Sequence, residues 1–327
     1  MDTDLAPRTL DGTDLTVGRI VFGAMTFGSQ VDEPEAKRMV ARAREAGVTM
    51  FDTSNNYNGG VSEEILGRVI KPIRGEVQIT TKVGSFVDQD DQELKGLGKK
   101  AIIRSLEGSL ERLGTDYVDV YYFHRPDYET PIEESLEAMD DLVQAGKVRY
   151  VAQSNFAAWQ IAEALGLAAQ HGWPELRIAQ QQYNLISRRV EDEYELATRR
   201  LGLSTIVYNP LAGGLLTGKH RYEDVPESDS RFTKAVYRDR YWNRDVFDAI
   251  EELRGVAADA DMSLIELSFR WLLARPMTTC LLLGASRMEQ LEQNLAAIDG
   301  PLPDESIMRR CDEVWGKLRG SAPRYNR

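Results

Sequence analysis

The chain has 327 residues, of which 42% are hydrophobic and 28% are charged, a composition typical of a soluble globular protein. Its 52 acidic residues outnumber the 40 basic ones, and the net charge of −12 argues against nucleic acid as a partner, because the phosphate backbone attracts basic proteins. The two cysteines form neither a disulfide framework nor a zinc spacing, so we expect a reducing, cytoplasmic setting and no metal site.

The sequence indicates neither a secretory signal nor a membrane span. Its start has no basic region followed by an apolar run. The longest uncharged stretch, residues 204–218, is too short and too rich in Gly and Pro to cross a bilayer. We therefore expect no membrane partner.

The first predicted element is a hairpin at residues 8–17, where an Asp-Gly turn separates short apolar ends. From there the chain repeats a short β-branched run, a loop and an amphipathic helical stretch, and this alternation predicts a parallel sheet. Helices are expected, for example, at 33–47, 131–146 and 287–298. The predicted strands are 19–23, 48–52, 77–83, 117–124, 147–154, 177–182, 204–209 and 278–284.

About eight strand–helix units favour an α/β fold of the closed (β/α)8 TIM-barrel type over an open doubly wound sheet. The hairpin would close the barrel bottom, and extra helices would follow at the C-terminal end. The glycines of GAMTFG (23–28) have the wrong spacing for a Rossmann fold. We expect one domain over residues 1–327, with the long charged and aromatic stretch 219–244 as a lid.

Ionisable side chains lie at the ends of consecutive predicted strands, where barrels carry their active sites. Asp52, Lys82 and His124 end the second, third and fourth strands, and Tyr57 lies on the loop after Asp52. A lysine ammonium stabilises a phenolate, and an aspartate keeps that ammonium charged. Tyr57 would then donate a proton while His124 donates a hydrogen bond to a carbonyl oxygen. Taken singly, the lysine and aspartate also suit a structural ion pair, and the histidine suits the core.

The sequence resembles the aldo-keto reductase superfamily along nearly its whole length, in particular the bacterial members related to potassium-channel β subunits. The motifs that carry the resemblance include FDTSNNYNGGVSEEILG, LGTDYVDVYYFHRPD, GKVRYVAQSNF, YNPLAGGLLTGK and LLLGASRMEQLEQNL, in that order. The resemblance implies a (β/α)8 barrel that uses a nicotinamide cofactor to reduce carbonyl groups to alcohols. It assigns Asp52, Tyr57, Lys82 and His124 to the family's catalytic tetrad.

The same resemblance implies a set of cofactor-binding residues. Ser154, Asn155 and Gln180 match positions that hold the nicotinamide carboxamide, and Tyr208 matches the aromatic residue that stacks on its ring. The backbone of residues 210–218 resembles the segment that covers the pyrophosphate. The further cofactor positions are Met25, Pro210, Leu211, Gly213, Lys219, Gly284, Ser286, Arg287, Gln290 and Asn294.

The adenosine end departs from the family pattern. Many members have a lysine where Gly284 stands and an arginine where Gln290 stands, and both serve the 2′-phosphate. Arg287 is able to replace them as a fork-shaped phosphate ligand, which favours NADP(H) over NAD(H). Three residues in other motifs also depart from the family pattern, although none of them is a reacting group. They are Asn58, Gln153 and Asn209.

We expect the substrate to be a small aldehyde or ketone, with a sugar-like ketone as a narrower hypothesis. The lip of the mouth is expected at Met25, Phe27, Phe86, Arg125, Tyr241 and Trp242, although each also suits loop packing. Two other functions stay open. One is a cofactor-binding regulatory subunit, and the other is a lyase that forms a Schiff base on Lys82. A homo-oligomer is compatible with the sequence.

Overall fold

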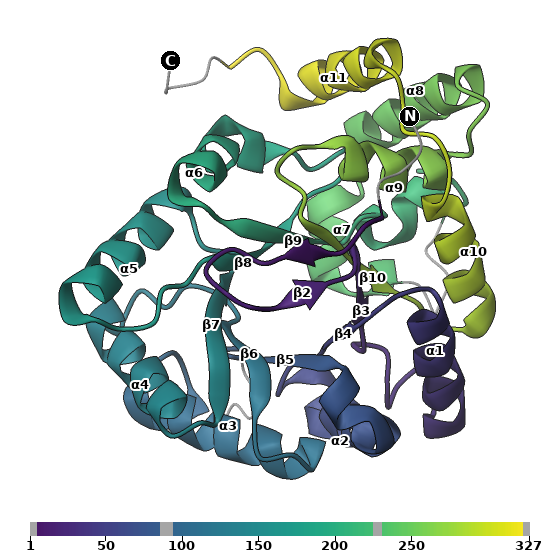
Figure 1. Ribbon diagram of the computed structural model, residues 1–327. Coiled ribbons are helices and arrows are strands. Elements are labelled where there is room, and N and C mark those ends of the chain that lie inside the picture. The colour runs from purple at the N-terminus through teal and green to yellow at the C-terminus, as the bar shows by residue number, and fades with distance from the viewer. Residues whose placement is uncertain (1–4, 86–93, 225–230, 323–327) are drawn as a thin grey trace.

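The computed structural model describes residues 5–85, 94–224 and 231–322, and within these ranges eight parallel strands close into a barrel (Figure 1). Each strand pairs with the next one along the chain, and β10 closes the barrel by pairing with β3. The (β/α)8 prediction is confirmed. The strands are β3 (Ile20–Gly23), β4 (Met50–Asp52), β5 (Gln78–Val83), β6 (Val118–Phe123), β7 (Val148–Ser154), β8 (Ile178–Gln182), β9 (Ser204–Tyr208) and β10 (Cys280–Gly284).

Helices surround the barrel, and their ends carry the expected stop and start signals. Ser263 and Glu266 form a capping box at the start of α9, and Gly114 ends α3 in the left-handed conformation. The last helix, α11, packs on α8 as the expected C-terminal addition. The helices are α1 (Glu33–Glu45), α2 (Val61–Ile70), α3 (Lys99–Leu113), α4 (Ile132–Gln144), α5 (Ala158–His171), α6 (Tyr194–Leu201), α7 (Ala235–Tyr241), α8 (Arg244–Asp259), α9 (Leu264–Ala274), α10 (Met288–Ile298) and α11 (Glu305–Arg319).

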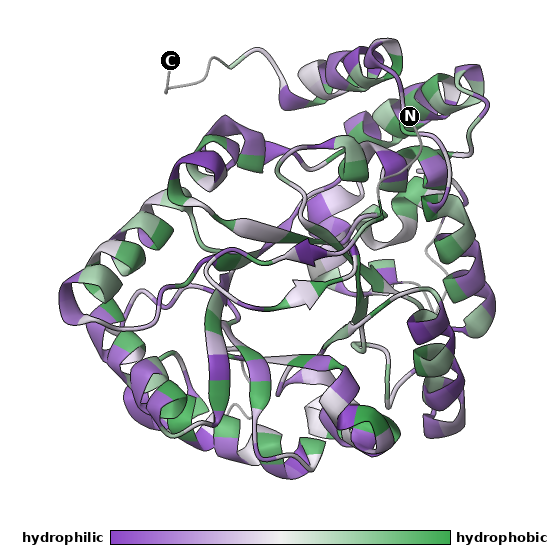
Figure 2. Ribbon diagram, in the orientation of Figure 1, coloured by the Kyte–Doolittle hydropathy of each residue, from purple (hydrophilic) through white to green (hydrophobic). Residues whose placement is uncertain are grey.

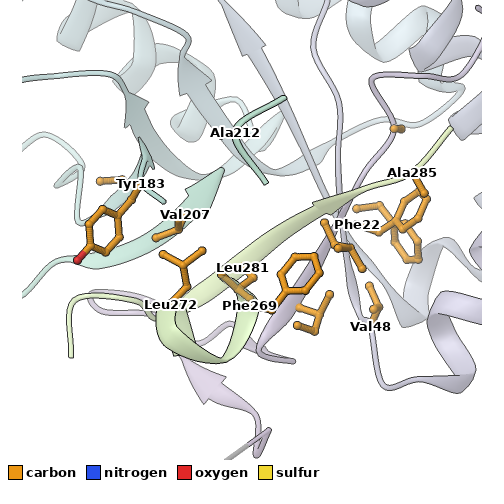
Figure 3. Close-up of a cluster of buried hydrophobic side chains, with 14 of the residues drawn as sticks. Phe22, Val48, Tyr183, Val207, Ala212, Phe269, Leu272, Leu281 and Ala285 are labelled. Atoms are coloured by element: carbon orange, nitrogen blue, oxygen red, sulfur yellow. The ribbon is translucent and has the colours of Figure 1, made fainter. Parts of the chain in front are cut away.

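The hydrophobic core has two layers. The outer layer fills the space between strands and helices, and Figure 3 shows part of it, with Phe22, Val207 and Leu281 of the strands near Phe269 and Leu272 of α9. The outer helices accordingly carry both hydrophobic and hydrophilic segments (Figure 2). The inner layer fills the barrel itself with Val21, Met50, Val120, Tyr122, Ala152, Ile178, Ile206 and Cys280.

The predicted hairpin closes one end of the barrel. Strand β1 (Arg8–Thr9) pairs antiparallel with β2 (Thr16–Val17), and the hairpin crosses the near opening of the barrel in Figure 1. Leu15 is buried against the inner layer, and the Asp11 amide donates a 2.8 Å hydrogen bond to Ser204 at the start of β9. The opposite, C-terminal end of the strands is thereby left for a functional site.

Strand alternation directs the predicted site residues into that open end. Side chains two positions apart on a strand share a face, so a residue two positions after an inner-layer residue faces the barrel axis. The strands are slightly shorter than predicted, and His124 and Asn209 each lie one residue beyond a strand end. The residues that follow inner-layer residues in this way are Asp52, His124, Ser154, Gln180 and Tyr208.

The stretch expected as a lid is partly helical and partly buried. Residues 225–230 lie outside the described residues, and α7 follows them. Phe232 and Tyr241 are buried, and Trp242 packs edge-on against Phe247 with ring centroids 4.9 Å apart. The segment is therefore anchored by aromatic packing. Within the described ranges, no helix has the length and apolarity needed to cross a membrane.

The hairpin plug makes a measurable contribution to stability. We expect Leu15→Ala to lower the free energy of unfolding by about 2–4 kcal/mol, because it leaves a cavity at the barrel bottom. Leu5→Ala, at a side chain 37% exposed, serves as the control and should change it by less than about 0.5 kcal/mol. Urea denaturation followed by tryptophan fluorescence measures both. Equal midpoints for the two variants would contradict the plug.

Candidate active site

A buried ion pair lies at the centre of the open end of the barrel. The Lys82 Nζ lies 2.6 Å from the Asp52 Oδ2 and donates a second hydrogen bond of 2.7 Å to the Thr53 carbonyl oxygen. The other Asp52 oxygen accepts from Thr80 Oγ1 at 2.6 Å. Both charged side chains are almost fully buried, at 0% and 1% exposed. Burial lowers the pKa of Lys82 from its usual value, and the Asp52 carboxylate opposes that shift.

A second buried carboxylate, that of Glu63, lies near this pair, and it was not predicted from the sequence. Glu63, fully buried at the start of α2, accepts from Thr81 Oγ1 at 2.5 Å and from Arg112 Nε at 2.7 Å. Its negative charge raises the pKa of Lys82 and so helps to hold the ammonium form. The helical phase of Glu63 relative to the buried Leu66 and Ile70 would have predicted its burial.

The loop that carries Tyr57 is held in a specific conformation. Asn58 adopts a left-handed backbone, with φ of 52°, and its side-chain amide donates to the carbonyl oxygens of Met25 (2.9 Å) and Phe27 (2.7 Å). At Gly60, with φ of 94°, an added Cβ would lie 2.7 Å from the Arg112 side chain. These contacts explain why an asparagine stands at position 58. Asparagine tolerates a left-handed backbone, and its side chain binds the loop to the segment that contains Met25 and Phe27.

Tyr57 meets the ion pair and His124. The Lys82 Nζ lies 5.1 Å from the centroid of the Tyr57 ring, and the Tyr57 and His124 rings contact edge to face at 5.9 Å. Burial raises the pKa of Tyr57 well above its usual value, and the Asp52 carboxylate raises it further. The pKa of Tyr57 is therefore raised rather than lowered, and the charge of Arg231 opposes the increase.

His124 is neutral in this environment. Its Nδ1 lies 3.1 Å from the Ser54 Oγ, and the Ser54 hydroxyl donates to Asn56 Oδ1 at 2.7 Å. Burial, together with the positive charges of Lys82 and Arg125, lowers the pKa of His124 to about 3. An uncharged imidazole therefore faces the barrel mouth at neutral pH.

The residues expected to hold a nicotinamide lie together beside this cluster. Gln180 Nε2 donates to Asp52 Oδ1 at 3.1 Å, and the Ser154 hydroxyl donates to the Gln180 carbonyl oxygen at 2.9 Å. The Tyr208 hydroxyl donates to Asn155 Oδ1 at 2.6 Å. Asn155 has a φ of 64°, an uncommon conformation that is compatible with a functional position.

The predicted pyrophosphate segment forms a turn after β9. Asn209 Oδ1 accepts from the Gly213 amide at 2.6 Å, which explains an asparagine at this position. Gly214 has a φ of 110°, and an added Cβ there would meet nothing within 4 Å, so its backbone borders open space. Among the other predicted residues of this segment, Pro210 is buried, Leu211 and Gly213 are half-buried, and Lys219 is exposed.

The predicted adenosine segment connects β10 to α10. An added Cβ at the exposed Gly284 would also meet nothing within 4 Å. Gln290 Oε1 accepts from the Ser286 amide at 3.0 Å and from the Ser286 hydroxyl at 2.8 Å. Asn294 is buried on α10, whereas Arg287 is exposed at the residue before the helix. This segment borders a hollow of about 500 Å³.

The residues expected at the lip divide into several groups. Phe27 and Tyr241 are buried and belong to the core, and Trp242 is part of the aromatic packing described above. Arg125 is exposed, and its Nε donates to the Gly84 carbonyl oxygen at 3.1 Å. Met25 is half-buried and Phe86 lies outside the described residues.

From the sequence, Arg231 was expected to belong to a solvated segment before α8, and Tyr237 was not singled out. The charge of Arg231 and the phenol of Tyr237 both act on the pKa of Tyr57, and an added Cβ at Gly213, in the turn after β9, would lie 3.2 Å from the Tyr237 ring. The Arg231 guanidinium lies 5.9 Å from the centroid of the Tyr237 ring. Only the folding of this long segment over the barrel brings them there.

The aldo/keto reductase family model matches residues 19–315. The chain belongs to the aldo/keto reductase family. A probable voltage-gated potassium channel subunit beta of Oryza sativa subsp. japonica is 35% identical over 94% of this chain and 95% of its own length. Aflatoxin B1 aldehyde reductase member 2 of Rattus norvegicus is 35% identical over 100% of this chain and 92% of its own.

Human aldo-keto reductase family 7 member A3 is 35% identical to this aldo/keto reductase, over 94% of this chain and 96% of its own length. Family membership and the reductases among its relatives support an oxidoreductase with carbonyl reductase activity and a nicotinamide cofactor. The residues fit such a cofactor in two respects. Amide and hydroxyl groups lie together where the nicotinamide is expected, and the backbone at Gly214 and Gly284 borders open space.

The lowered pKa of His124 makes the free energy of unfolding of this aldo/keto reductase depend on pH. The unfolded chain takes up the proton near an ordinary pKa of about 6.5, and the folded protein does so only near 3. This group therefore contributes full stability above the unfolded value, and the stability is lost as the pH falls from 6.5 toward 3. We expect His124→Gln to reduce that loss in urea denaturation across this pH range.

The imidazole itself is observable by NMR, because the chain has only 3 histidines. We expect the signal that disappears in His124→Gln to stay in its neutral position down to about pH 4, given a group that titrates near 3. A His124 signal that titrates near its ordinary value would show that the imidazole is solvated rather than buried.

Proposed function

We propose that the protein is an NADP(H)-dependent reductase that converts aldehydes or ketones to alcohols, with Tyr57 as the general acid. The observation that supports this best is the buried Asp52–Lys82 pair, at 2.6 Å, beside Tyr57 and His124. A buried ion pair alone is compatible with a structural role. A phenol and a neutral imidazole at the same barrel mouth favour proton transfer to a carbonyl oxygen.

A bound nicotinamide dinucleotide supplies the hydride that reaches the carbonyl carbon. Tyr57 is protonated at neutral pH, since a phenol ordinarily has a pKa of about 10 and burial raises that of Tyr57 further, so it has a proton to donate to the oxygen. The phenolate left by that transfer is stabilised by the ammonium of Lys82, which Asp52 and Glu63 hold in its charged form. The lysine therefore acts most strongly on the state that follows proton transfer.

His124 orients the substrate without adding charge. A neutral imidazole hydrogen-bonds a carbonyl group and does not compete with Tyr57 as an acid. In this proposal Ser154, Asn155 and Gln180 hold the carboxamide, and Tyr208 lies against the nicotinamide ring. Met25 and the turn of Pro210, Leu211, Gly213 and Lys219 border the remainder of the cofactor, and Gly284, Ser286, Arg287, Gln290 and Asn294 surround the adenosine end.

The proposed preference for NADP(H) depends on Arg287, whose guanidinium suits a phosphate dianion. The proposed substrates include aldehydes, because the rat relative is named as an aldehyde reductase. A sugar-like ketone is a narrower proposal that depends on Arg125 and Arg231 near the mouth. Residues 1–327 are proposed to act as a single domain, located in the cytoplasm, alone or as a homo-oligomer.

A second candidate function is that of a cofactor-binding regulatory subunit, because the rice relative is named as a channel subunit. Both candidates require cofactor binding, and they differ in turnover. A lyase that uses Lys82 is disfavoured, because both Asp52 and the Thr53 carbonyl oxygen accept hydrogen bonds from the lysine Nζ.

One experiment separates these candidates. Tryptophan fluorescence is followed while NADPH or NADH is added to the purified protein. 4-Nitrobenzaldehyde is then added, and the absorbance of the reduced nicotinamide is recorded. Binding followed by oxidation of NADPH supports the reductase. Binding without oxidation of NADPH by a panel of aldehydes favours the regulatory subunit, and no binding of either nucleotide contradicts both.

The role of Tyr57 is tested by Tyr57→Phe. We expect aldehyde reduction to fall by about 10²–10⁴-fold, the usual contribution of a general acid, while the dissociation constant for NADPH is unchanged. Tyr128→Phe, at a tyrosine 80% exposed, is the matched control and should keep full activity. A Tyr57→Phe protein with near-normal turnover would show that another group donates the proton.

A further inference from the structure

The hollow at the adenosine end is lined by charges of both signs. It lies between the first turn of α1 and the segment before α10. Arg38 and Arg287 contribute positive charge, and Asp32 and Glu35 contribute negative charge. The formal charges of these four side chains cancel. A hollow suited to a phosphate dianion would have an excess of positive charge.

Glu35 is bound to the groups that would otherwise attract an anion. Its Oε1 accepts a 3.0 Å hydrogen bond from the Met288 amide, the first residue of α10. Its Oε2 forms an ion pair with Arg38 one turn further along α1. Asp32 has a different role, because its Oδ1 accepts from the Glu35 amide at 2.9 Å and caps α1. The carboxylate of Glu35 therefore already binds both the Met288 amide and the Arg38 guanidinium.

The other groups at this end do not compensate for Glu35. The Ser286 amide and hydroxyl both donate to Gln290 Oε1. Gly284 has no side chain and contributes no positive charge. Arg287 is exposed, so solvent screens its charge. Repulsion between Glu35 and an incoming phosphate is therefore opposed mainly by one exposed arginine.

We propose that Glu35 weakens the preference for NADP(H), by competing with the 2′-phosphate of this cofactor for the Met288 amide and Arg38. This inference rests on the proposed nicotinamide-dependent function. NAD(H) carries a hydroxyl group in place of that phosphate, so it does not have to displace the carboxylate. The ratio of NADP(H) affinity to NAD(H) affinity is therefore smaller than it would be with Arg287 but without Glu35.

The test is the binding of four nucleotides to the wild-type protein and to Glu35→Gln. Fluorescence quenching gives the dissociation constants of NADPH and NADH, and isothermal titration calorimetry gives those of adenosine 2′,5′-bisphosphate and ADP. In Glu35→Gln, we expect the two ligands with a 2′-phosphate to bind about five- to tenfold more tightly, as the loss of a like charge at a helix N-terminus implies. NADH and ADP should keep their affinities.

Glu33→Gln is the matched control. Glu33 also lies in the first turn of α1, but it pairs with Arg68 at 2.8 Å, so the variant should change none of the four affinities. Glu35→Asp withdraws the carboxylate by one methylene and should give an intermediate tightening for the same two ligands. Thermal melts followed by circular dichroism establish that each variant is folded.

The outcomes are distinguishable. An unchanged ratio of NADPH to NADH affinity in folded Glu35→Gln and Glu35→Asp would overturn the inference and leave the proposed function intact. Equal tightening of all four ligands would also overturn it, since that result indicates a general charge effect. No binding of any nucleotide to the wild-type protein would contradict the proposed function itself.

Discussion

The buried ion pair between Asp52 and Lys82 is the constraint on which the rest of the structure depends. Two charges removed from water are costly unless each is fully hydrogen-bonded. Here Thr80, the Thr53 carbonyl oxygen and Gln180 provide the remaining partners. Asp52 lies on β4 and Lys82 on β5, and these three partners come from β5, the loop after β4 and β8, so the pair is satisfied only when the barrel is closed. The site and the fold are therefore stabilised by the same contacts.

The position of Tyr57 follows from this arrangement. Its loop leaves β4 directly after the ion pair and returns at the start of α2, where Glu63 and Arg112 are already bound to each other. Asn58 and Gly60 adopt left-handed conformations that shorten the path between these two fixed ends. A tyrosine held at both ends of a short turn keeps its distance to Lys82. This restricts the proton donor without placing it in the rigid sheet.

The proposed cofactor site has two ends with different electrostatics. Near the barrel axis the groups are neutral amides, hydroxyls and an uncharged His124, apart from the buried pair. At the adenosine end, Arg287 and Glu35 carry full charges close to water. Burial decides the chemistry at the first end, because it shifts pKa values strongly. At the second end the charges are close to water, so salt screens them. A change in one side chain, such as Glu35, is then able to alter the preference for a ligand.

The sequence by itself determined the barrel and most of the candidate site. Alternating strand and helix patterns specify (β/α)8 because periodicity is a local property, and residues at the ends of parallel strands must meet at one edge. Only the tertiary structure decided the rest. Glu63 and Glu35 look like ordinary acidic residues of amphipathic helices. Their partners, Arg112 and Met288, lie 49 and 253 residues away along the chain, and no local pattern encodes such contacts.

The direction of the Tyr57 pKa shift was likewise a tertiary property. The sequence places a lysine near the phenol, which suggests a lowered pKa. Burial and the Asp52 charge raise it instead, because a phenolate is poorly solvated in the folded barrel and lies near a carboxylate. The types of residue in the site follow from the sequence. The balance of their charges depends on how deeply the folded barrel buries each one.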